Sequence, residues 1–193
     1  MIKISDITID YHSLLRSEDT VYYTDQPKPV LGFCLESDEQ NVRLETAYIS
    51  LNGWQTCVNE ITYVSYGGEE LLPMQTYTIC VQVKTTDGNQ TEAHATFETG
   101  RMDLPWKGNW ITDLSIINTS PLSPRPLEFR KNIILQKPVR SMKVLATALG
   151  IYDLYWDGER INTEYFAPGF TDYDHHLQYG IYPLEDIQPG TYE

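Results

Sequence analysis

The chain has 193 residues, of which 41% are hydrophobic, and its formal net charge is −13. This length suits one large or two small domains, and the hydrophobic fraction is enough for packed cores, which excludes a largely disordered chain. The negative charge opposes the approach of polyanions, so we expect neither nucleic acid nor a membrane as a partner.

The N-terminus shows no apolar run behind a basic segment, and no later window approaches about 18 consecutive apolar residues. We therefore expect no signal peptide, no membrane span and a cytoplasmic location. The cysteines are odd in number: Cys34, Cys57 and Cys80. Alternation places Cys34 and Cys80 on faces turned away from the core, so we expect no disulfide between sheets, in agreement with a reducing compartment.

Alternating apolar and polar residues dominate the first hundred positions, and helical periodicity is almost absent. Turns are expected at Gly67-Gly68 and Asp87-Gly88. The pattern predicts strands at residues 2–9, 30–36, 42–51, 61–64, 77–84 and 91–97. It favours a fibronectin type III-like or Ig-like β-sandwich over residues 1–100, in which Leu72-Pro73 and Tyr77 form a corner where the tyrosine hydroxyl bonds nearby backbone.

A second domain is expected over residues 101–193, because Pro105 ends the alternation and two tryptophans then open a new apolar block. We expect Trp106 and Trp110 to pack between the domains. Ser115 to Pro126 holds three prolines and is predicted to be a surface loop.

Strands are predicted at residues 127–135 and 139–149, with Lys137-Pro138 as the turn between them, and residues 151–156 lead into an Asp157-Gly158 hairpin. The block is short for a large two-sheet sandwich. It is therefore predicted to be an incomplete jelly-roll-type β-sandwich, whose unpaired edge a second copy of the chain would cover in a homodimer.

The stretch from Gly150 to Gln178 gathers aromatic side chains and the carboxylates of Asp153, Asp157, Asp172 and Asp174. Such a ribbon either packs as core or holds a polyhydroxylated ligand. Its candidates for stacking on a sugar are Trp156, Tyr165, Phe170 and Tyr173.

Alternation of Tyr152, Leu154 and Trp156 favours a core position for Trp156. For the carboxylates, the favoured interpretation is that Asp157 is the acceptor of the Asp-Gly turn and that Asp172 bonds local backbone. His175 and His176, as neighbours on a strand, would point to opposite faces and would not share a metal ion.

Several spaced motifs resemble bacterial α-L-rhamnosidases. The segment FETGRMDLPWKGNWIT resembles the junction between their fibronectin-like module and the following sandwich, LEFRKNIILQKPVRSMKVLATALGIYDLYWDGERI resembles the next block, and EYFAPGFTDYDHHLQYGIYPLEDIQPG the continuation. The chain departs from that pattern at Asp157, where the family has Asn, at Phe170, where it has Trp, and at Pro183 to Asp186.

The resemblance implies a non-catalytic N-terminal region, because the family's catalytic carboxylates lie in a C-terminal (α/α)6 barrel, and hydrolysis needs two carboxyls held across the scissile bond. We therefore assign no catalytic residue here. The expected function is an accessory region of an enzyme that hydrolyses terminal α-L-rhamnose from glycosides. The alternatives are a stand-alone rhamnose-binding module and a structural or dimerisation module.

The expected partners are a rhamnose-containing glycan or the catalytic barrel of the same polypeptide. Some members of the family bind rhamnose on such a sandwich with the help of calcium, which takes oxygen ligands. No cofactor is required by the sequence, and calcium is the one considered, with Asp157 and Asp172 as ligands. The candidate sugar-binding residues are Asp153, Trp156, Asp157, Asn162, Asp172 and Tyr173.

Overall fold

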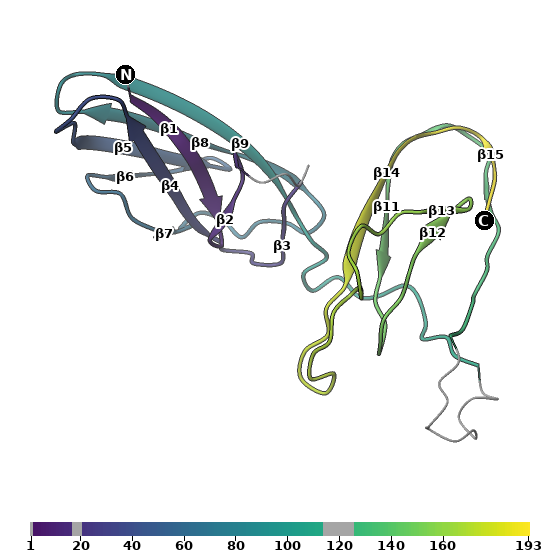
Figure 1. Cartoon of the computed structure of the whole chain (residues 1–193). Helices are drawn as coiled ribbons and strands as arrows, with labels where there is room; N and C mark the ends of the chain where they lie inside the picture. Colours follow the sequence, from purple (N-terminus) through teal and green to yellow (C-terminus); the bar gives the residue numbers. More distant parts are fainter. Residues whose placement is uncertain (1, 17–20, 114–125) are drawn as a thin grey trace. The chain divides into compact units, whose positions relative to one another are not determined.

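The computed structural model describes residues 2–16, 21–113 and 126–193, and every regular element in these ranges is a β-strand. Within them, no helix is long and apolar enough to cross a membrane. The chain divides into two compact units, Met1–Gly108 and Asn109–Glu193 (Figure 1). The all-β class predicted from alternation is confirmed.

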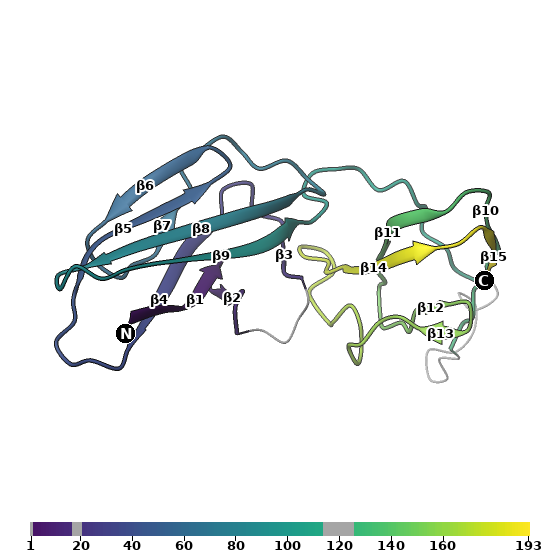
Figure 2. The same cartoon turned by 90° about the horizontal axis from the view of Figure 1, so that it is seen from above.

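The first unit is a sandwich of two sheets, whose strands run across the view in Figure 2. One sheet has the order β2-β1-β4-β7 and the other the order β3-β9-β8-β5-β6. All described pairs are antiparallel except β3 with β9. The strands are β1 (Ile2–Ile9), β2 (His12–Ser13), β3 (Tyr23–Thr24), β4 (Val30–Ser37), β5 (Leu44–Leu51), β6 (Trp54–Val58), β7 (Val64–Ser65), β8 (Thr76–Thr85) and β9 (Gln90–Thr99).

Strand β1 buries apolar side chains at both even-numbered and odd-numbered positions. Ile2 and Ile4 are buried, and so are Ile7 and Ile9, although strict alternation would turn one pair outward. The register with β4 shifts between Ile4 and Asp6. This bulge inserts one extra residue and returns Ile7 to the core face.

The core lies between the two sheets and is filled by the alternating residues that the sequence predicts. Ile49, Ile79 and Val81 have no exposed surface, and Ala47 and Leu31 are equally enclosed. The opposite faces are polar or exposed. Cys34 and Cys57 are exposed and Cys80 is half-buried, and all three are free thiols.

The predicted tyrosine corner is present. The Tyr77 hydroxyl accepts a hydrogen bond of 2.8 Å from the backbone N–H of Leu72, and the Tyr77 ring stacks on Phe97 with a centroid distance of 5.9 Å. The corner joins the start of β8 to the turn before it. It therefore ties a loop to the core through one side chain.

One hairpin was absent from the sequence-based prediction. Asn52 and Gly53 have φ values of +48° and +78° and join β5 to β6 in a two-residue turn. The strand predicted at residues 61–64 is wrong in its first half, since Ile61 is 55% exposed and only Val64 and Ser65 pair with β4. The apolar Ile61 between polar residues gave the alternating pattern of a strand, although it lies outside any strand.

The second unit contains three separate two-stranded ladders. Its strands are β10 (Ile133–Leu135), β11 (Val139–Ala146), β12 (Tyr155–Trp156), β13 (Glu159–Arg160), β14 (Gly180–Ile187) and β15 (Gly190–Tyr192). The turn at Lys137-Pro138 does not make a hairpin, because β10 pairs with β15 and β11 pairs with β14. The prediction of a strand from residue 127 is wrong for residues 127–132, which lie outside any strand.

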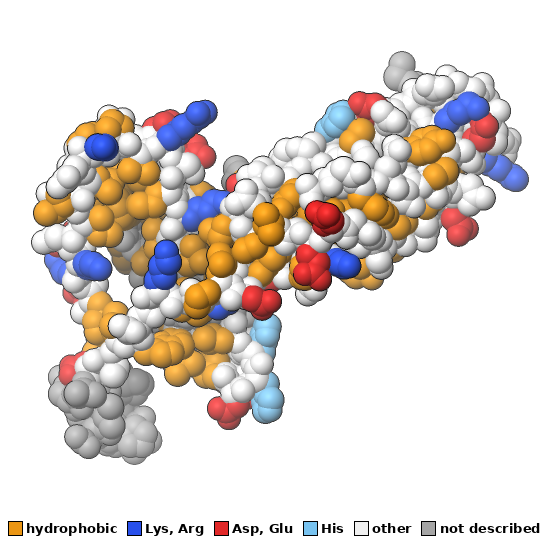
Figure 3. Space-filling model, turned by 180° about the vertical axis from the view of Figure 1, so that it is seen from behind, with side chains coloured by type: hydrophobic (Ala, Val, Ile, Leu, Met, Phe, Trp, Pro, Cys, Tyr) orange, Lys and Arg blue, Asp and Glu red, His pale blue; other side chains and the backbone are white. Residues whose placement is uncertain are grey.

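Apolar side chains of the second unit are largely exposed, and Figure 3 shows them as orange areas over its surface. Among its described residues, the buried apolar side chains are Ala167, Tyr182 and Ile187. The large exposed ones include Ile134 at 70%, Phe166 at 72% and Phe170 at 89%. Within residues 126–193, these ladders therefore have no second sheet packed over them of the kind that the first unit has.

Two further predictions concern the segment between the units. Trp106 is 41% exposed, with the Arg101 guanidinium 5.1 Å from its ring centroid, and Trp110 is 64% exposed. The loop predicted at Ser115 to Pro126 falls almost entirely outside the described residues. The packing of Trp106 and Trp110 between the two domains stays a prediction.

Candidate functional site

The predicted hairpin between β12 and β13 is present. Asp157 and Gly158 have φ values of +50° and +84°, as a type I′ turn requires, and Trp156 pairs with Glu159. The Asp157 N–H donates a hydrogen bond to the carbonyl of Glu193, while its side chain is exposed. The turn therefore accounts for an acidic residue at this position without a ligand.

The other residues of the hairpin engage one another. Arg160 forms an ion pair of 2.7 Å with Asp153 and donates a hydrogen bond of 2.9 Å to the carbonyl of Glu164. Its guanidinium also lies 5.4 Å from the ring centroid of Tyr165. Trp156 is half-buried and stacks on Tyr192 at 5.1 Å, which agrees with the core position that alternation favours.

Asn162 is only 2% exposed, and its amide is occupied. Its Oδ1 accepts a hydrogen bond of 2.7 Å from the Leu154 N–H, and its Nδ2 donates one of 3.1 Å to the Glu164 carbonyl. A buried amide with both ends satisfied stabilises the local fold. Contact between Asn162 and a ligand would require those bonds to open.

Asp172 organises the turn that follows. Its backbone carbonyl accepts hydrogen bonds from the N–H groups of His175 and His176, at 3.0 and 2.7 Å. Its carboxylate accepts bonds from the Asp174 N–H at 3.3 Å and lies 2.9 Å from Nδ1 of His175. The strand expected for His175 and His176 is wrong, because an Asp at the first position favours a turn.

Aromatic side chains of the same stretch lie at the surface. Phe170 packs edge-on against Tyr173 with a centroid distance of 5.6 Å, and Phe170 is 89% exposed. Neither Asp157 nor Asp172 belongs to a group of three or more potential metal-ligating side chains in the described ranges. Sugar or calcium binding by the predicted residues therefore stays a prediction.

A small cavity of about 160 Å³ lies beside this stretch and was not predicted. Its lining residues are Glu164, Tyr165, Phe166, Ala167, Pro168, Gly169, Tyr179, Gly180 and Tyr182. The hydroxyl of Tyr182, one of these lining residues, is 2.7 Å from that of Tyr152, and burial raises the pKa of Tyr182 above its ordinary value, as does its bond to Tyr152. The cavity thus offers aromatic walls, neutral hydroxyls and one carboxylate.

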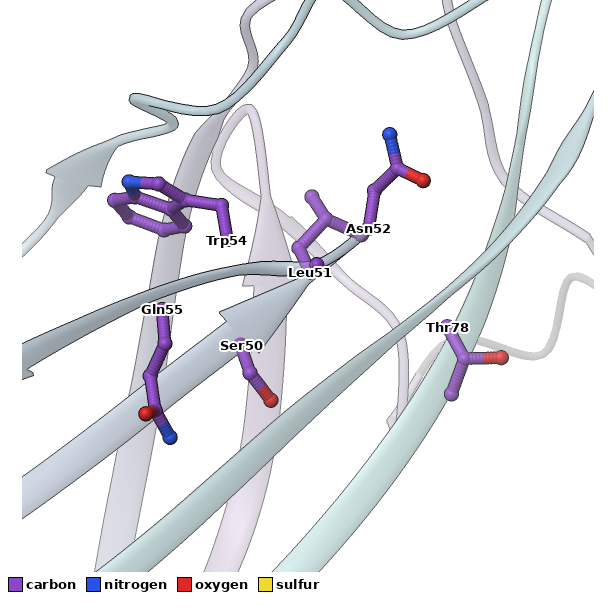
Figure 4. Close-up of a pocket in the computed structure, with 7 residues that line it drawn as sticks. Ser50, Leu51, Asn52, Trp54, Gln55 and Thr78 are labelled. Carbon is purple, nitrogen blue, oxygen red and sulfur yellow. The ribbon is translucent and has the colours of Figure 1, made fainter.

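A larger cavity of about 390 Å³ lies in the first unit, where β5, β6 and β8 run side by side (Figure 4). Its lining residues are Ser50, Leu51, Asn52, Gly53, Trp54, Gln55 and Thr78. In Figure 4 the Ser50 and Gln55 side chains point away from the face that carries Trp54. This cavity therefore opens on the outer, polar face of the sheet, and none of its lining residues is charged.

Two family models match the chain. The model described as "Rha78A-like, N-terminal immunoglobulin domain" matches residues 6–103, more than half of the chain, and that described as "Alpha-L-rhamnosidase N-terminal domain" matches residues 137–188. A curated alpha-L-rhamnosidase of Streptomyces avermitilis is 38% identical over 65 residues, which are 33% of this chain and 6% of that protein. The chain thus spans a small part of this relative.

Solved structures agree in fold. The alpha-L-rhamnosidase from Dictyoglumus thermophilum superposes with a TM-score of 0.75 at 23% identity, over 98% of this chain and 25% of that one. The enzyme from Aspergillus terreus gives a TM-score of 0.69 at 16% identity, over 100% of this chain and 23% of that one. The resemblance to N-terminal rhamnosidase domains and the Ig-like sandwich expected for the first unit are confirmed.

Proposed function

Because the chain belongs to the family of Rha78A-like N-terminal immunoglobulin domains, we propose that it is the non-catalytic N-terminal region of an enzyme that hydrolyses terminal α-L-rhamnose from glycosides. The same proposal places the catalytic carboxylates in a C-terminal barrel of the same polypeptide. In this role the two units support that barrel and shape the approach of the substrate.

The distribution of carboxyl groups carries this proposal. Glycoside hydrolysis uses two carboxyls held across the scissile bond, one of them with a raised pKa. The larger cavity has no acidic residue in its lining, and the smaller one has only Glu164. The carboxyl pKa values that depart from the ordinary range, those of Glu36, Asp87 and Glu92, are all lowered by hydrogen bonds from neighbouring side chains.

The exposed apolar side chains of the second unit support the accessory role. Ile134, Leu149 and Ile151 are each more than 60% exposed. Apolar surface of this extent is typical of a face that another layer of protein covers. A catalytic barrel or further strands of the same polypeptide would supply that layer.

An assay of the chain alone with an aryl α-L-rhamnoside tests the non-catalytic role. We expect no release of the aryl group above the rate in buffer. Release that is lost in Glu164→Gln would contradict the proposal, since Glu164 is the one carboxylate in a described cavity. The matched control is Glu159→Gln, which changes an exposed carboxylate on the preceding strand β13.

Carbohydrate binding is the second candidate, and the exposed rings beside the small cavity favour it. Tyr165 is 82% exposed and Phe170 89% exposed, and open aromatic faces stack on the C–H faces of sugars. Titration with L-rhamnose, with and without calcium, tests this function. No heat, and no shift of resonances near Asp157, Asp172 or Tyr165, would exclude it.

Dimerisation is a third role, supported by the unpaired outer edges of the two-stranded ladders of the second unit. Sedimentation of the chain at increasing concentration tests it. A compact monomer at the highest concentration would exclude it.

A further inference from the structure

Three side chains of different chemistry meet on the outer face of the larger sheet of the first unit. Cys80 on β8 is the cross-strand partner of His94 on β9, and Glu92 lies two residues before His94 and so on the same face. The Cys80 sulfur, a Glu92 carboxylate oxygen and a His94 ring nitrogen all lie within 4.8 Å of one another. Two strands therefore present a triangle of three potential ligands.

Each ligand already has an orienting neighbour. Glu92 accepts a hydrogen bond of 2.6 Å from Nε2 of the Gln82 amide, and its other oxygen lies 2.6 Å from the His94 ring. Ser50, the cross-strand partner of Cys80 on β5, lies on the same face of the sheet and near the sulfur. Such outer partners hold metal ligands in place in protein sites.

A cation bound here would be attracted by the Glu92 carboxylate and would displace the proton of the Cys80 thiol. Burial raises the pKa of the Cys80 thiol above its ordinary value, and the charge of Glu92 raises it further. Lys84 follows Cys80 by four residues on β8. Its ammonium group lies 2.8 Å from the Glu45 carboxylate, so this positive charge is already held in an ion pair. A divalent ion would compensate a thiolate and a carboxylate at once.

The chemical types of the three side chains indicate which metal ion would bind. Thiolate and imidazole ligands favour zinc over magnesium or calcium, which prefer oxygen. Tetrahedral zinc with bonds of about 2.0–2.3 Å holds its ligand atoms roughly 3.5 Å apart, so closure from 4.8 Å needs only side-chain rotation. The Glu92–His94 hydrogen bond, at 2.6 Å, opens when both groups turn to the ion.

The space around the cluster leaves room for a further ligand. Ser50 lines the cavity of about 390 Å³ and pairs across the strands with Cys80, and Thr78 lines it from two residues before Cys80. Three protein ligands beside an open cavity match the arrangement in which zinc keeps an exchangeable position. Water or a small donor ligand would complete the shell from that side.

We propose that Cys80, Glu92 and His94 bind one zinc-class divalent ion on the outer face of the first unit, with the fourth coordination position open to the cavity lined by Ser50 and Thr78. The site is independent of the role proposed for the chain in a rhamnosidase. It lies on the polar face of the first unit, whereas the predicted sugar-binding residues belong to the second.

Calorimetric titration of the reduced full chain with Zn²⁺ tests the proposal, and Co²⁺ absorption adds a signal specific for thiolate ligation. We expect one equivalent to bind, with a sulfur-to-cobalt charge-transfer band. Cys80→Ser should abolish that band, and His94→Gln should weaken Zn²⁺ binding at least about tenfold, since the loss even of an outer partner costs about 10–100-fold. His94 is exposed, so its variant tests the site without disturbing the core.

Cys57→Ser is the matched control, because Cys57 is an exposed thiol on β6, which β5 separates from β8 in the same sheet, and it lies outside the triangle. His175→Gln is the second control, because His175 pairs with a carboxylate in the second unit. Both should bind Zn²⁺ as the unchanged chain does. Unchanged affinity in Cys80→Ser and His94→Gln, or no binding by the unchanged chain, would overturn the proposal.

Discussion

The two units are built from the same kind of element but bury their apolar residues to different degrees. In the first unit two sheets enclose one core, in which Ile49 and Ile79 have no exposed surface. In the second unit the ladders are two-stranded, and Ile134 on one of them is 70% exposed. Isolated two-stranded ladders are marginal in water, so the second unit depends more on polar networks and on a covering layer.

The largest expected difference between the units is the cost of removing an isoleucine side chain. Ile49→Ala should lower the free energy of unfolding by about 2–5 kcal/mol, because it leaves a cavity in a closed core. Ile134→Ala should change it by no more than about 0.5 kcal/mol, because the side chain is exposed. Urea denaturation measures both, and similar losses would refute the contrast.

In the second unit we expect a buried amide to contribute more than that exposed isoleucine. Asn162→Ala should cost about 1–3 kcal/mol, because the Leu154 N–H would lose its partner and the Glu164 carbonyl would keep only its bond from Arg160. Amide hydrogen exchange should accelerate in β12 and β13 and stay unchanged in β8 and β9. The control, Asn132→Ala, alters an exposed amide, and equal acceleration there would contradict the role of Asn162.

A smaller effect is expected at the tyrosine corner of the first unit. Tyr77→Phe removes the hydroxyl that accepts the Leu72 N–H and should cost about 1 kcal/mol. Tyr48→Phe, on a ring that is 44% exposed, serves as the control and should be close to neutral. A corner variant as stable as the control would show that the bond contributes nothing measurable.

The first unit should also lose some stability in alkaline solution. Burial, with the charge of Asp10, raises the pKa of Tyr22 to about 12 in the folded chain, above the ordinary value of 10.0. The neutral hydroxyl is therefore favoured by folding, and its contribution is complete below pH 10.0 and is lost as the pH rises towards about 12. Unfolding measured across this range should show a decline that Tyr22→Phe reduces, and an unchanged decline would contradict the assignment.

Local sequence determined several elements because the information lies within a few residues. Asp157-Gly158 predicts its hairpin through the backbone freedom that a type I′ turn needs. Tyr77 after Pro73 predicts the corner, and alternation predicts which residues fill the first core. Asn52-Gly53 carried the same kind of signal, and the hairpin there could have been predicted.

Only the tertiary structure decided which residues became neighbours. The bulge after Ile4, the pairing of β10 with β15, and the meeting of Cys80 with His94 depend on strand register between segments far apart in the chain. Alternation states which way a side chain faces, but not which strand lies beside it, so the triangle of ligands appears only once the sheet has formed.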